Sequence, residues 1–114
     1  MTTKAEYRAQ AEAIGRQADR YDAIATSLYG FGDRARETQE GPFLGPLEAS
    51  ISRGLGDLVS AATSLRSVAA ACLIRADLIL QHEIDVQIWE FENRDVLPFD
   101  RPRPPQWTHD WSNR

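Results

Sequence analysis

Apolar and small residues recur at alternating spacings of four and three near the start of the chain. The seven positions are Tyr7, Ala11, Ile14, Ala18, Tyr21, Ala25 and Leu28. This rhythm places them on one narrow stripe of a long helix, which is typical of a helix that packs against another helix along its length. We call these residues the first contact stripe.

A second contact stripe follows after a glycine-rich interval. Its members keep the same spacing and are Ile51, Leu55, Leu58, Ala62, Leu65, Ala69, Cys72, Ala76 and Ile79. Two long stripes separated by a single connection predict an all-α fold, an antiparallel two-helix hairpin with a long second helix. Cys72 is the chain's one cysteine. It is expected to be a small buried hydrophobic residue rather than a reactive thiol.

The first helix is predicted over about residues 4–29. Thr3 and Glu6 have the spacing of a capping box, in which the Thr hydroxyl accepts a hydrogen bond from the backbone N–H three residues later. Gly30 and Gly32 are expected to end this helix. The hairpin as a whole is predicted to span residues 1–94.

Residues 30–45 are predicted to form the loop between the helices. Because antiparallel helices usually join through about two to eight residues, the first helix continuing by another turn through Ala35 and Arg36 remains an alternative. Pro46 marks the start of the second helix, predicted over 46–93, since proline lacks the N–H that a first helical turn leaves unpaired.

Beyond Cys72 the second helix becomes apolar on two sides. The additional set, which we call the apolar row, consists of Leu73, Leu80, Ile84, Ile88 and Phe91. The shorter first helix cannot cover both this row and the contact stripe. A second copy of the chain, a different helical partner, or the C-terminal tail folding back are the candidates to cover it.

Residues 95–114 are predicted to form an extended tail. Four of the six prolines fall in this segment, which excludes a regular helix there. The tail also carries Trp107 and Trp111. These tryptophans either dock on the hairpin, or anchor a partner, or belong to a disordered end.

The charge balance argues against two classes of function. Thirteen basic and seventeen acidic residues give a net charge of -4, which does not favour binding to nucleic acid. Arg66, Arg75 and Asp77 interrupt the most apolar stretch, so no membrane span is expected. The N-terminus lacks the features of a signal peptide, so any export is expected to use another route.

The sequence offers no recognisable catalytic, metal or cofactor site. His82 and His109 have no second ligand at a spacing that suits zinc. Neither a phosphate-binding glycine loop nor a nucleophile motif is present. The prediction is therefore a non-enzymatic protein without cofactors.

Some segments resemble a known family. Gly41-Pro42-Phe43, followed by the Leu-, Ala- and Ser-rich helix over residues 55–76, is similar to the start of the second helix in the EspC-like branch of helical-hairpin substrates of actinobacterial type VII (ESX) secretion. The Trp-X-Gly motif of the core branch is absent, because the corresponding segment reads Tyr29-Gly30-Phe31-Gly32.

The resemblance implies an export signal, which in this family is an aromatic residue followed four residues later by an acidic one, just past the second helix. Phe91 and Asp95 are a degenerate match in the expected place, whereas Tyr29 and Asp33 fit the letters better but lie where the first helix meets the interhelical loop. A shared helical face would present both side chains to the secretion machinery. The alternative is that Phe91 simply packs.

The expected function is therefore that of a helical interaction protein, a type VII secretion substrate or targeting partner that pairs with another helical protein or a larger effector. It would be secreted without a signal peptide. Its expected partner-binding residues are the apolar row together with Trp107 and Trp111. A cytoplasmic adaptor, chaperone or immunity-type protein, or a phage structural component, is the alternative.

Overall fold

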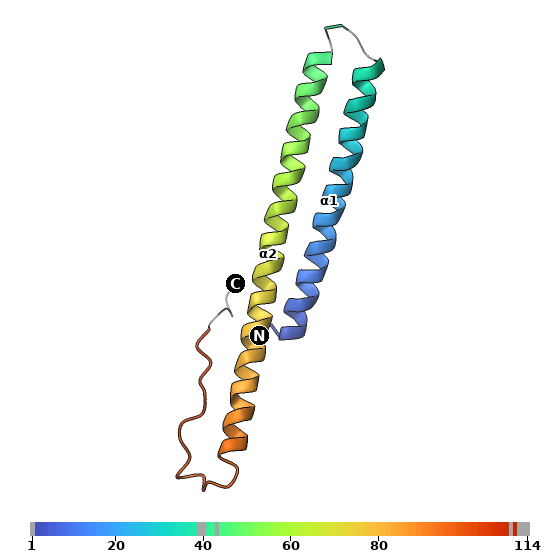
Figure 1. The fold of residues 1–114 in the computed structure, drawn as a ribbon. Helices are drawn as coiled ribbons and strands as arrows, with labels where there is room; N and C mark the ends of the chain where they lie inside the picture. The colour runs from blue at the N-terminus through green and yellow to red at the C-terminus, as the bar shows by residue number, and fades with distance from the viewer. Residues whose placement is uncertain (1, 39–40, 43, 110, 112–114) are drawn as a thin grey trace.

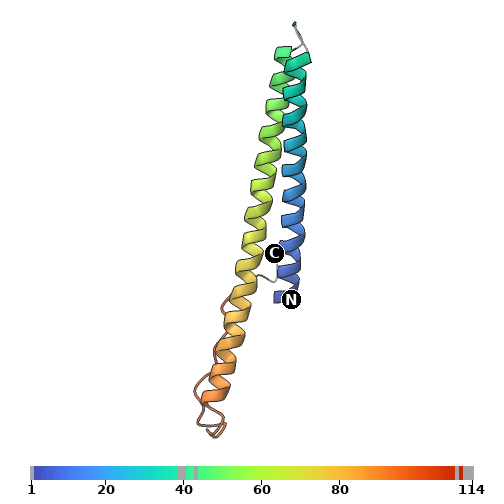
Figure 2. The same ribbon diagram turned by 45° about the vertical axis from the view of Figure 1, so that its right-hand side comes forward.

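The computed structural model describes residues 2–38, 41–42, 44–109 and 111. It contains two long helices, α1 (Lys4–Thr38) and α2 (Leu44–Glu92). They run antiparallel and side by side, and the molecule is a rod of 86 × 21 × 16 Å (Figures 1 and 2). No strand occurs in the part of the chain described. The predicted all-α hairpin is confirmed.

The start of α1 follows from the cap that the sequence encodes. The Glu6 backbone N–H donates to Thr3 Oγ1 at 3.1 Å. The Tyr7 N–H donates to the Thr3 carbonyl oxygen at 3.0 Å. The first four N–H groups of a helix have no partner within the helix, and the Thr3 hydroxyl satisfies the one on Glu6. The Tyr7 bond is the first of the regular bonds within the helix, so Thr3 is the N-cap residue.

The predicted end of the first helix at residue 29 was wrong, because α1 continues through Gly30 and Gly32 to Thr38. Gly32 and Ala35 extend the first contact stripe in the same four-three rhythm, and both are buried. A Cβ atom on Gly32 would lie 3.4 Å from Ile51 Cγ2, an ordinary van der Waals contact, so Ile51 of α2 packs directly over this position. This packing outweighs a helix penalty of about 1 kcal/mol per glycine.

The predicted loop 30–45 was too long, because α1 ends at Thr38 and α2 begins at Leu44. Gly41 has a φ of 108°, a left-handed conformation that glycine adopts without steric cost. The Leu44 N–H donates to the Gly41 carbonyl oxygen at 3.3 Å. Helix α2 starts slightly before the predicted position, and Pro46 lies in its first turn as expected.

The two contact stripes form the interface between the helices. Three alanines, Ala18, Ala62 and Ala76, are almost completely buried there. Their small side chains permit a close approach of the two helices, because interaxial distance depends on the residues at the contact. Cys72 is also buried in this interface, which confirms its predicted role.

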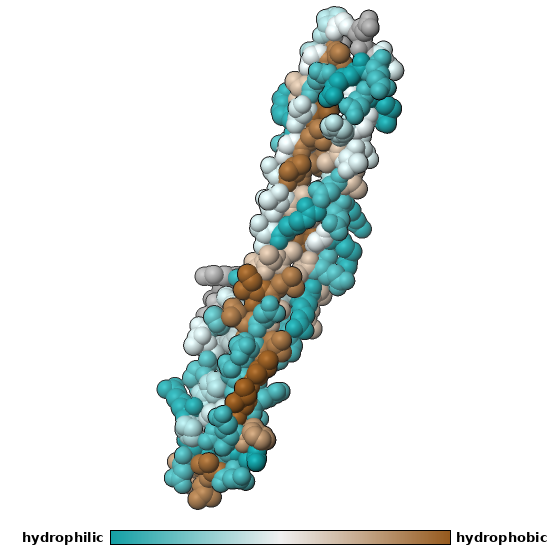
Figure 3. All heavy atoms as spheres, in the orientation of Figure 1, coloured by the Kyte–Doolittle hydropathy of each residue, from teal (hydrophilic) through white to brown (hydrophobic). Residues whose placement is uncertain are grey.

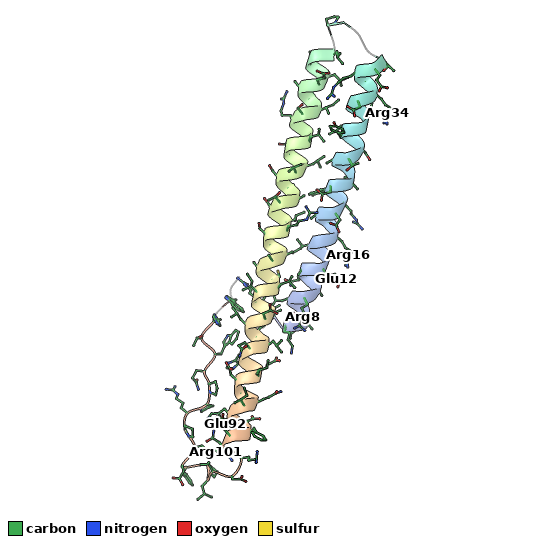
Figure 4. All side chains as sticks on the ribbon, in the orientation of Figure 1. Arg8, Glu12, Arg16, Arg34, Glu92 and Arg101 are labelled. Atoms are coloured by element: carbon green, nitrogen blue, oxygen red, sulfur yellow. The ribbon has the colours of Figure 1, made fainter. Side chains whose placement is uncertain are left out.

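Ion pairs at the surface connect the helices along the rod. They are Arg36–Glu48 at 3.1 Å, Arg66–Asp19 at 3.2 Å, Arg66–Asp22, and Lys4–Glu83 at 2.6 Å. Hydrogen bonds to Asp22 and Asp19 raise the pKa of Arg66 above its ordinary value. On the side of α1 that faces away from α2, Arg8, Glu12 and Arg16 project into solvent (Figure 4).

Helix α2 extends well past the N-terminal end of α1. At 1.5 Å per residue, 35 residues correspond to about 52 Å and 49 residues to about 73 Å. The C-terminal tail reverses after α2 and runs back alongside this extension toward the N-terminus of α1 (Figure 1). Glu92 at the end of α2 and Arg101 of the tail lie at the same end of the rod (Figure 4).

Candidate functional site

The apolar row remains largely exposed along the C-terminal half of α2, partly beside α1 and partly beyond its N-terminal end. Leu73 is 48% exposed, Ile84 39%, Ile88 50% and Phe91 67%, whereas Leu80 is partly buried. A hydrophobic streak is visible on this part of the rod (Figure 3). Neither α1 nor the tail covers the row.

The position of the row around α2 explains why it stays exposed. Successive helical residues are rotated by about 100°, so the row lies about a quarter turn from Cys72 and Ala76, which face α1. The tail contacts His82 and Trp89, on the other side of the contact stripe. The chain therefore covers α2 on two sides and leaves the side with the row open.

The tail is anchored at the end of α2 by hydrogen bonds. Asn93 is buried, and its Nδ2 donates to the Trp89 carbonyl oxygen at 2.8 Å. The Trp89 indole N–H donates to the Pro102 carbonyl oxygen at 3.2 Å. Arg101 Nε donates to the Val96 carbonyl oxygen at 2.9 Å. These bonds hold the reversal of the chain in place.

Further along, the tail joins an aromatic cluster on the hairpin. The cluster consists of Tyr7, Arg75, His82, Trp107, His109 and Trp111. The Trp107 ring lies 5.3 Å from His82 and 5.4 Å from Trp111, measured between centroids. The Arg75 guanidinium lies 4.9 Å from the centroid of Trp111, a cation–π distance.

Trp107 and Trp111, predicted as partner anchors or self-docking groups, therefore lie against their own hairpin. The cluster also brings both histidines to Trp107, with His109 at 5.2 Å. No local signal pairs them, because only the reversal of the proline-rich tail makes them neighbours.

The residues of the candidate export signal lie in different local structures. Phe91 belongs to the last turn of α2, whereas Asp95 follows the helix and its side chain is 92% exposed. The Arg94 guanidinium lies 4.1 Å from the Phe91 ring centroid and 3.6 Å from the Asp95 carboxylate. The other match, Tyr29 and Asp33, lies in α1 rather than in a loop.

A pocket of about 420 Å³ lies at the N-terminal end of α1, between that end, α2 and the Trp107 ring. Its walls include Thr3, Ile79 and His82. Such a lining suits an apolar or aromatic side chain rather than a charged ligand. Among the residues that the structure describes, no three histidine, cysteine or carboxylate side chains come together as a metal site.

Helix α2 contains an 18-residue stretch with a mean hydropathy of 1.4, which is apolar enough by length and composition to cross a membrane. The expectation of no span came from Arg66, Arg75 and Asp77, but this 18-residue stretch contains no more than two charged residues. One such helix is weak evidence, because the core helix of a soluble protein meets the same criterion.

Comparison with protein-family models, with curated proteins and with solved structures gave no match.

Proposed function

We propose that this chain is a non-enzymatic interaction protein that uses the apolar row to bind a helix of another protein. The observation that supports this function is the exposure of four large apolar side chains in one line on α2. Contiguous apolar surface of this kind is typical of an interaction site in a soluble protein. An amphipathic helix laid along such a line is a recurrent mode of recognition.

The tail contributes to this function indirectly. Because Trp107 and Trp111 are engaged with Tyr7, Arg75 and His82, the tail holds the extension of α2 on the side away from the row. A partner helix at the row would then pack on α2 opposite the tail, and along residues 73–83 it would also lie beside α1.

The resemblance to type VII secretion substrates supports a more specific proposal. If the chain is a type VII secretion substrate, it pairs with another helical protein or a larger effector and is exported without a signal peptide. The export signal would then contain Phe91 and Asp95. Both are exposed and accessible to secretion machinery.

Copurification of the tagged full chain from its native host, followed by mass measurement of the intact complex, tests the binding function. Ile84→Glu combined with Ile88→Glu should release the partner. Val59→Glu is a matched control, because Val59 is 55% exposed on the same helix but outside the row. A partner that stays bound to the doubly substituted chain would refute the proposed site.

Export is tested separately by the amount of protein in the culture supernatant. Phe91→Ala with Asp95→Ala should abolish release, whereas Tyr29→Ala with Asp33→Ala should not. If wild-type protein stays in the cytoplasmic fraction, the secretion proposal fails while the binding proposal stands. Normal release of the Phe91 and Asp95 variant would remove these two residues as the signal.

A further inference from the structure

We infer that the occupant of the apolar row is a basic amphipathic helix belonging to a different protein. This inference rests on the proposed function and specifies the chemistry of the partner. It follows from the charges around the row, from their lack of basic partners, and from the length of the exposed surface.

All the charged side chains in the segment that carries most of the row are acidic. Residues 76–93 contain five acidic residues and neither lysine nor arginine. The acidic residues are Asp77, Glu83, Asp85, Glu90 and Glu92. The preceding part of α2 is different, because Arg53, Arg66 and Arg75 occur there. The negative charge is therefore local to the proposed binding surface.

Four of these carboxylates lie on the two flanks of the row, whereas Asp77 lies on the face of the row itself, between Leu73 and Leu80. At about 100° per residue, Glu83 and Glu90 are rotated to one side of the row by about 100°, and Asp85 and Glu92 to the other side by a similar angle. In a pair of packed helices, residues that flank the apolar seam face the flanking residues of the partner. Lysine or arginine at those positions of a partner would be attracted on both sides.

Few of these carboxylates are already neutralised. Glu83 forms an ion pair with Lys4 at 2.6 Å. For Asp77, Asp85, Glu90 and Glu92, no lysine or arginine nitrogen lies within 4 Å in the residues that the structure describes. Arg94, at the foot of the row, lies over the Phe91 ring instead.

The same charges disfavour a second copy of this chain as the occupant. Two copies joined through the row would place acidic flanks against acidic flanks, and like charges at such positions oppose pairing. An anionic lipid surface would be repelled for the same reason. The row extends from Leu73 to Phe91, about 27 Å along the helix, so it matches a partner helix of about 18 residues.

Two synthetic helical peptides of about 18 residues test this inference with the full chain. Both carry the same leucine stripe, but one has lysine and arginine at the flanking positions and the other has glutamate. Fluorescence anisotropy should give a dissociation constant at least about tenfold lower for the basic peptide. Raising the salt concentration should weaken this binding, because exposed charges are screened.

Two variants of the chain test whether the peptide binds at the row and whether the flanking carboxylates set its charge preference. Ile84→Glu with Ile88→Glu should reduce binding of the basic peptide at least about tenfold, whereas Val59→Glu should not change it. Asp85→Lys with Glu90→Lys should reverse the preference, so that the acidic peptide binds more tightly. Since the latter variant leaves the apolar residues intact, it remains informative even if the former does not fold. Circular dichroism checks the helix content of each.

Several results would overturn the inference. They are equal binding of the two peptides, binding of neither, a dimer of the chain alone that Ile84→Glu converts to a monomer, and cosedimentation with phosphatidylcholine vesicles that this substitution abolishes. If the native partner requires the row but Asp85→Lys with Glu90→Lys leaves its affinity unchanged, only the charge inference fails. If the native partner does not require the row, the proposed function fails.

Discussion

The same substitution at two isoleucines of α2 tests whether the apolar row is free in the isolated protein. Ile51 is 7% exposed and packs against Gly32 of α1, whereas Ile88 in the row is 50% exposed. We expect Ile51→Ala to destabilise the hairpin strongly and Ile88→Ala to have a small effect. The two variants have the same chemistry in the same helix.

The magnitudes follow from the buried surface. Replacing isoleucine by alanine removes three carbons, worth about 2.4 kcal/mol when they are fully buried, at about 0.8 kcal/mol per group. At Ile51 a cavity term adds to this loss, and a total of about 2–4 kcal/mol is typical of such sites. At Ile88, which is half exposed, about half of these roughly 2.4 kcal/mol are lost. The higher helix propensity of alanine recovers about 0.4 kcal/mol of that loss.

The expected difference between the two variants is therefore about 2 kcal/mol in the free energy of unfolding. Urea denaturation followed by circular dichroism at 222 nm measures it, with sedimentation velocity confirming that both variants are monomers. Equal losses at the two positions would show that Ile88 is covered in the isolated protein. In that case the reasoning from the exposed row to a partner would be refuted.

Four further predictions concern the fold and the tail. Gly15→Ala should raise the unfolding free energy by about 0.5–1 kcal/mol, because the helix favours alanine and a Cβ there meets nothing within 4 Å. Gly54→Ala should stabilise the protein less than Gly15→Ala, or destabilise it, since its Cβ would lie 3.1 Å from Leu28 Cδ2. Thermal denaturation compares the two variants. An equal gain in stability would show that Leu28 does not crowd position 54. Ala18→Leu should destabilise by about 1–3 kcal/mol through overpacking in a fully buried site, and an unchanged unfolding midpoint would argue against close packing of the helices. Trp111→Ala should release the tail and increase acrylamide quenching of the remaining tryptophans without loss of helical circular dichroism, whereas unchanged quenching would show that the cluster does not hold the tail.

Much of the fold follows from spacing alone. The four-three rhythm predicts the helix interface, because side chains at these spacings share one face of a helix. Cys72 and Ala76 of the second contact stripe are buried, and so are Tyr7 and Ala11 of the first. The cap at Thr3 is local and is also predicted correctly. These features depend only on residues a few positions apart.

The end of α1 shows where local signals are insufficient. Gly30 and Gly32 are poor helix formers, so a local criterion ends the helix at residue 29. The continuation to Thr38 is accompanied by contacts with α2, since Ile51 packs over Gly32, Ala35 is buried, and Arg36 pairs with Glu48. The rhythm itself contains the missing signal, since Gly32 and Ala35 continue it. A glycine that continues a contact stripe is therefore better read as part of the helix interface than as a helix end.

By itself, the sequence determines two helices with matching stripes, a second helix longer than the first, and a proline-rich tail without regular structure, because each depends on local periodicity or on backbone chemistry. Only the tertiary structure decides which side of the long helix stays exposed. The reversal at Asn93 brings Trp107 and Trp111 to His82, Tyr7 and Arg75, and these contacts join residues far apart in sequence. The energy of such contacts depends on three-dimensional geometry, which local spacing does not specify.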